Sequence, residues 1–217
     1  MPIPSCRGLP ARRRIVANYK LVPIAHVALL SGQEKQNAAG GVLTDRYYAF
    51  EYEEVVRPAN RGVFFCGYVC GESFCDLLGI AHLTQFDPLR PVPAIAGVGA
   101  RLPVGAGGAG AVVVGAAGHA PAMDPLNLEL YQAINLHVVL SNTPPHGGYG
   151  ATLEYIRKNP TRRTRPEYVV RFNNYLMKAY GGATLLSKCA AIPGIKTFSF
   201  PEIAAVLIAE GVHNYYE

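Results

Sequence analysis

Tryptophan is missing from this 217-residue sequence, charged residues make up only 16% of it, and no apolar run is long. The low charge excludes a disordered acidic tail and a highly charged coiled coil. Glycine, proline or a polar residue breaks each apolar run well before the ~18 residues that a membrane-spanning helix needs. No apolar region of the signal-peptide type follows the basic residues 1–14. These absences predict a soluble, cytoplasmic protein without a membrane partner.

The cysteines form an odd and clustered set, because three of the five lie within ten residues. An odd number of cysteines in a chain without a secretory signal argues against a disulfide framework. The sequence therefore predicts reduced thiols.

Zinc is one candidate for the cysteine cluster. Cys66, Cys70 and Cys75 are followed seven residues later by His82, and zinc prefers four nitrogen or sulfur ligands. The spacing contains no Cys-x2-Cys pair, however, and free cysteines are often simply buried in a core. Two interpretations therefore stand, a structural core cluster and a zinc site made by these four residues.

A cysteine nucleophile is the remaining interpretation of the cluster. Cys70 or Cys75 near the start of a helix would have a lowered thiol pKa. A histidine beside it would act as the base in acyl transfer. The candidate bases are His82, His119, His137 and His146. No local pattern places one of them beside a thiol, so the sequence favours a protein that is not an enzyme.

The net charge of +5 is concentrated in two basic islands. Residues 1–20 carry five basic side chains and no acid, and residues 154–178 carry seven against two acids, so each island contributes +5 and the rest of the chain −5. Such islands attract phosphates, or pair with the chain's own carboxylates. The candidate nucleic-acid contacts are Arg12, Arg13, Arg14, Arg157, Lys158, Arg162, Arg163, Arg165, Arg171 and Lys178.

The clearest strand pattern covers residues 47–56, which are rich in aromatic and β-branched side chains. Tyr48, Phe50 and Tyr52 alternate with small or acidic residues, as expected of a strand with one buried face. A turn and a second apolar run follow, which together predict a hairpin. The shorter apolar run 22–30 fits a strand or a helix equally well.

Helical spacing of apolar residues predicts five helices. They cover residues 70–79, 126–140, 150–158, 166–180 and 203–210. Thr164 and Ser199, each followed three residues later by glutamate, predict capping boxes for the last two.

The combined pattern predicts an α+β fold, with a small antiparallel β unit and one helix, a Gly/Pro-rich connector and a mainly helical C-terminal half. The expected parts are a basic flexible arm (1–20), an α+β part with the cysteine cluster (21–86), a Gly/Pro/Ala-rich connector or long loop (87–122) and a helical part (123–217).

The leading functional hypothesis is a binding protein that contacts nucleic acid through its basic segments, with structural or zinc-bound cysteines. The first alternative is a cysteine-dependent enzyme with a histidine base. The second is a protein-interaction module that binds an acidic partner.

Overall fold

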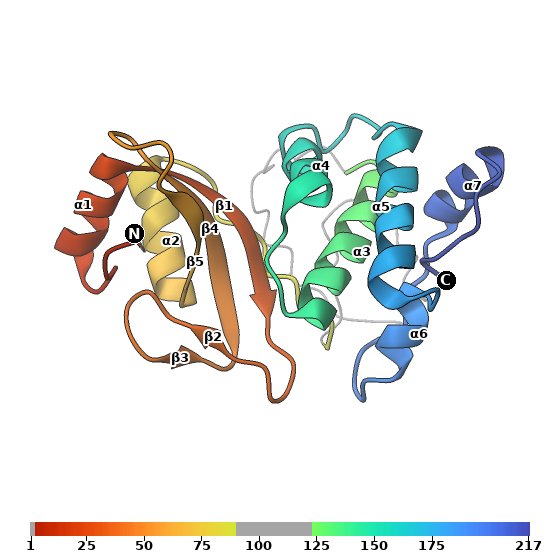
Figure 1. Cartoon of the computed structure of the whole chain (residues 1–217), viewed down its shortest axis with the longest axis horizontal. Coiled ribbons are helices and arrows are strands. Elements are labelled where there is room, and N and C mark those ends of the chain that lie inside the picture. Colours follow the sequence, from red (N-terminus) through yellow and green to blue (C-terminus); the bar gives the residue numbers. More distant parts are fainter. Residues whose placement is uncertain (1–2, 90–122) are drawn as a thin grey trace, which may run out of the picture.

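The computed structural model describes residues 3–89 and 123–217, and these have an α+β fold (Figure 1). The predicted fold class is therefore confirmed. A three-stranded sheet stands between two groups of helices, with α1 and α2 on one side and the helices of the C-terminal half on the other (Figure 1). The predicted connector 87–122 lies, from residue 90 onward, outside the described residues.

The sheet has the strand order β1-β4-β5 and is antiparallel throughout. Its strands are β1 (Tyr19–Ala28), β4 (Arg46–Glu54) and β5 (Arg61–Cys66). The predicted hairpin is the β4–β5 pair, and the ambiguous run 22–30 belongs to the edge strand β1 and the residues after it. A small ribbon of β2 (Lys35–Gln36) and β3 (Val42–Leu43) lies between β1 and β4 in the chain.

The two faces of β4 belong to two different hydrophobic cores. Tyr48, Phe50 and Tyr52 pack in the core beneath the N-terminal helices. Tyr47 and Ala49 point the other way and join the larger core of the C-terminal half. Successive side chains of a strand alternate between its faces, so one strand holds both cores together.

Two helices cover the N-terminal side of the sheet, α1 (Leu9–Asn18) and α2 (Tyr68–Leu78), and they pack against each other. Residues 1–20 were expected to form a flexible arm, but half of them, Leu9–Asn18, form α1. This helix gives a weak sequence pattern because Ile15 is its single fully buried residue. Glycine at position 71 allows α2 to lie directly on the sheet, since a Cβ there would be 2.2 Å from the ring of Tyr48.

The C-terminal half contains five helices within its described residues. They are α3 (Pro125–Ser141), α4 (Gly147–Lys158), α5 (Pro166–Tyr180), α6 (Leu185–Ala190) and α7 (Pro201–Ala209). The helix α3 is central, because it contacts β1, α4, α6 and α7. The sequence pattern missed the short α6. No helix in the described parts has both the length and the apolar character needed to cross a membrane.

The predicted capping boxes at Thr164 and Ser199 are wrong. The helices α5 and α7 each begin one residue later than those caps require, and neither has a side-chain cap at its N-cap position.

A residue from another helix caps α7 instead. The carboxylate of Glu129 in α3 accepts hydrogen bonds from the backbone N–H groups of Glu202 (3.2 Å) and Ile203 (2.9 Å). A negative charge at the positive end of a helix stabilises it.

Candidate functional site

Four of the five cysteines gather around the start of α2. Cys66 ends β5, Gly67 makes the turn, and Cys70 lies in the first turn of the helix. Cys75 lies one turn further on and points into the core. The strand-turn-helix connection therefore brings the Cys66 and Cys70 thiols close to each other at the end of β5.

The fourth thiol comes from the segment before α1. The backbone N–H of Cys6 donates to the carbonyl oxygen of Ala38 at 3.2 Å, and the N–H of Ala38 donates to the carbonyl of Phe65 at 2.8 Å. These hydrogen bonds connect the N-terminal segment to the loop between β2 and β3, and they connect that loop to β5. The Cys6 side chain is thereby buried, and its thiol donates a hydrogen bond to the Cys70 sulfur.

An arginine completes the cluster. The guanidinium of Arg12 in α1 donates to Ser73 Oγ at 2.9 Å, to the carbonyl of Cys6 at 3.4 Å and to Cys70 Sγ at 3.5 Å. One side chain thus joins α1, the N-terminal segment and α2 around a single sulfur. We call Cys6, Cys66, Cys70 and Arg12 the thiol cluster.

The thiol cluster holds the pKa of Cys70 at about 6. The hydrogen bond from the Cys6 thiol is the largest cause that lowers this pKa. The positive charge and the hydrogen bond of Arg12 lower it further, whereas partial burial raises it. Cys70 also lies near the amino end of α2, where the helix dipole favours a negative charge. Cys70 is therefore largely a thiolate at neutral pH.

The other thiols are held in their protonated form. Burial raises the pKa of Cys66, and the neighbouring Cys70 and Cys75 sulfurs raise it further. Burial is also the main cause that raises the pKa of Cys75 to about 11. The hydrogen bond to Cys70 is the largest cause that raises the pKa of Cys6, and burial is the second. Thiolates are the nucleophilic form of cysteine, so the cluster contains one activated sulfur, Cys70, beside a protonated partner.

The residues of the predicted zinc site are not assembled as ligands. His82 Nε2 lies 2.8 Å from the Asp76 carboxylate at the exposed end of α2, and Cys75 points into the core. Within residues 3–89 and 123–217, no group of three or more His, Cys, Asp or Glu side chains is placed to hold a metal ion. Of the predicted set, only Cys66 and Cys70 belong to the thiol cluster.

The candidate histidine bases have partners other than thiols. His82 pairs with Asp76, His137 Nδ1 lies 2.8 Å from the Tyr180 hydroxyl, and His146 Nδ1 lies 2.6 Å from the Tyr149 hydroxyl. Position 119 lies outside the described residues. Among the described residues, the cation that contacts Cys70 is Arg12.

The ten basic residues predicted to contact nucleic acid divide into two groups. Four make side-chain hydrogen bonds or ion pairs within the molecule, as shown by Arg157, which donates to the carbonyl of Pro23 at 2.7 Å, and by Arg163, which lies 2.9 Å from Glu202. These four are Arg12, Arg157, Lys158 and Arg163. The other six have exposed side chains and are Arg13, Arg14, Arg162, Arg165, Arg171 and Lys178.

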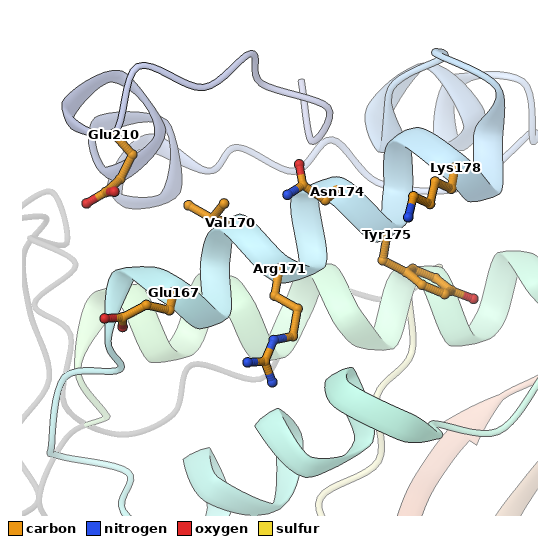
Figure 2. A pocket seen from close by; sticks show the side chains of 7 residues that line it. All are labelled: Glu167, Val170, Arg171, Asn174, Tyr175, Lys178 and Glu210. Carbon is orange, nitrogen blue, oxygen red and sulfur yellow. The ribbon is translucent and has the colours of Figure 1, made fainter.

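Two of the exposed basic residues line a shallow depression of about 520 Å³ over the outer face of α5 (Figure 2). Arg171 and Lys178 share it with Glu167 and with Glu210, at the end of α7 (Figure 2). Its other lining residues are Val170, Asn174 and Tyr175. Two basic and two acidic side chains thus share the depression, whereas a groove for a phosphate backbone is expected to be mainly positive. Nucleic-acid binding stays a prediction.

Cys6 and Arg12 are the two members of the thiol cluster that sequence reasoning did not connect with Cys70. The sequence pattern placed Arg12 in a basic island and gave Cys6 no role beyond that of a reduced thiol. Arg12 lies 58 residues from Cys70 in the sequence and Cys6 lies 64 residues from it, so no local spacing could have identified them.

Comparison with known proteins identifies a family. A family model described as "Uncharacterised conserved protein UCP028583" matches residues 5–212. No curated protein and no solved structure matches the chain. The matched range includes every residue of the thiol cluster.

Proposed function

The chain belongs to the uncharacterised conserved protein family UCP028583, and we propose that it acts through a reactive thiol at Cys70. The proposed chemistry is nucleophilic attack by the Cys70 thiolate on a small electrophile, of the kind used by thiol-dependent redox proteins. The observation that carries this proposal is the Arg12 guanidinium 3.5 Å from Cys70 Sγ, with the Cys6 thiol hydrogen-bonded to the same sulfur.

Exposure supports the same assignment. Cys70 is partly exposed, whereas Cys6, Cys66, Cys75 and Cys189 are buried. A reactive cysteine needs a stabilised thiolate and a route for the reactant, and structural cysteines usually have neither. Cys70 is the cysteine that has both.

Site-resolved alkylation tests the proposal. At pH 6, half of Cys70 is thiolate if its pKa is about 6, against roughly 0.3% of an ordinary thiol with a pKa of about 8.5. The less basic thiolate is intrinsically about tenfold less nucleophilic, which leaves a net advantage of about tenfold.

We therefore expect iodoacetamide at pH 6 to modify Cys70 about ten times faster in the folded protein than in urea. Cys75 and Cys189 should instead react more slowly when folded, because they are buried. The Cys70→Ser variant should lose the fast reaction and Cys189→Ser should keep it. Equal rates for Cys70 in the folded and unfolded chain would contradict the proposal.

A further inference from the structure

We propose that Cys6 is the resolving partner of Cys70, so that a hydroperoxide oxidises Cys70 and a reversible Cys6–Cys70 disulfide then closes. The inference rests on the proposed function, because it assigns a substrate class to the same reactive sulfur. Its own support is the geometry that places a buried second thiol against that sulfur.

The contacts select Cys6 over the other thiols. The Cys6 thiol is directly hydrogen-bonded to Cys70 Sγ, and Arg12 binds both residues, one through its backbone carbonyl and one through its sulfur. A disulfide requires two Cβ atoms about 3.5–4.5 Å apart, and among the described thiols Cys6 is the one in hydrogen-bond contact with Cys70. Cys66 lies nearby, but no hydrogen bond joins its thiol to Cys70 in the described contacts.

The first step forms a sulfenic acid. The Cys70 thiolate attacks one peroxide oxygen, the O–O bond breaks, and the second oxygen leaves as hydroxide, which a proton from solvent converts to water. The sulfur loses two electrons and the peroxide gains them. Hydrogen peroxide is small and uncharged, so it suits a sulfur that is only partly exposed.

The second step forms the disulfide. The Cys6 sulfur attacks the Cys70 sulfur, the S–O bond breaks, and the departing hydroxide takes the Cys6 proton to give a second water. The balance is one peroxide and two thiols to one disulfide and two waters. The hydrogen bond to Cys70 is the largest cause that keeps Cys6 protonated, and oxidation of Cys70 removes the thiolate that accepts it, whereas burial, the second cause, remains. Cys6 therefore becomes more nucleophilic once Cys70 has reacted.

Peptide mapping without reduction tests this inference on the full chain. Cleavage after arginine leaves Cys6 in the peptide of residues 1–7, whereas the next three thiols share a peptide that begins at Gly62. After treatment with one equivalent of hydrogen peroxide, we expect a cross-link between these two peptides, with fragment spectra that place it at Cys70. Dithiothreitol should remove it.

Variants make the test specific. Cys6→Ser should abolish the cross-link and let sulfinic acid accumulate on Cys70, whereas the matched Cys66→Ser should still form it. The wild-type map requires no variant, so the inference remains testable even if Cys6→Ser does not fold.

Two negative results separate the two proposals. Fast iodoacetamide modification of Cys70, combined with a Cys66–Cys70 link or with sulfinic acid alone, would overturn the resolving role of Cys6 and leave the reactive thiol in place. Slow reaction of Cys70 with both reagents would overturn the proposed function itself.

Discussion

Replacing Arg12 by glutamine removes the cation from the thiol cluster, and its effect follows from the distance between the guanidinium and the Cys70 sulfur. A unit charge 3.5 Å from Cys70 Sγ stabilises the thiolate by about 1.2 kcal/mol in water and about 4.7 kcal/mol at an effective dielectric constant of 20. Cys70 is partly exposed, so the lower end of this range applies. About 1.4 kcal/mol corresponds to one pH unit. We expect the midpoint of Cys70 reactivity to rise by about one pH unit.

The assay is the pH dependence of Cys70 alkylation, followed by mass spectrometry between about pH 4 and pH 9, a window that brackets both the native and the ordinary thiol pKa. The midpoint is the quantity to follow. A more basic thiolate is also more nucleophilic, so the rate at pH 6 alone should fall only about twofold. Arg12→Lys, which keeps the charge, should change the midpoint less. Arg13→Gln, at the next and exposed position of α1, should leave it unchanged.

An unchanged midpoint in folded Arg12→Gln would refute this reasoning. It would mean that the cation does not stabilise the thiolate and that the hydrogen bond from Cys6 and the amino end of α2 act alone. Circular dichroism of each variant shows whether the fold is retained, because Arg12 also bonds Ser73 and the Cys6 carbonyl.

Three further predictions concern the fold that carries the site. Gly71→Ala should lower the free energy of unfolding by about 1–3 kcal/mol in urea titrations, because its Cβ would overlap the Tyr48 ring, whereas Gly67→Ala meets only an ordinary 3.6 Å contact. Burial lowers the pKa of His137 to about 4. As the pH falls below about 6.5, His137 of the unfolded chain therefore binds a proton, whereas His137 of the folded chain stays neutral until about pH 4. Acidification from pH 7 to pH 4 should therefore cost the wild type about 3 kcal/mol more than His137→Phe, and equal losses would contradict the burial argument. Glu129→Ala should cost about 1–2 kcal/mol by uncapping α7, and an unchanged urea midpoint would show that the cap is dispensable.

The elements that the sequence predicts well are those whose signal is local. The alternation of Tyr48, Phe50 and Tyr52 is sufficient to identify β4, because one face of that strand packs under α2. The spacing of apolar residues identifies α5 over its full length. The helix α6 has six residues, too few for a periodic pattern to be distinguished from a loop.

The features that the sequence does not predict depend on contacts between distant residues. Glu129 caps a helix more than 70 residues away, so the local capping boxes gave the wrong answer. Cys6 and Arg12 reach Cys70 through tertiary packing of α1 on α2. Spacing alone grouped Cys70 with Cys75 and His82, whereas folding groups it with an arginine and a thiol from the N-terminal segment.

Ultraviolet absorbance of the thiolate, recorded against pH for the wild type and for Cys70→Ser, measures the ionisation on which the site depends. Below about pH 8 the difference between the two curves reports Cys70, because burial still raises the pKa of Cys6 and Cys66 in the variant. It should show a single step with a midpoint near pH 6. A difference curve that stays flat until about pH 8, where an ordinary thiol begins to ionise, would show that Cys70 is not activated.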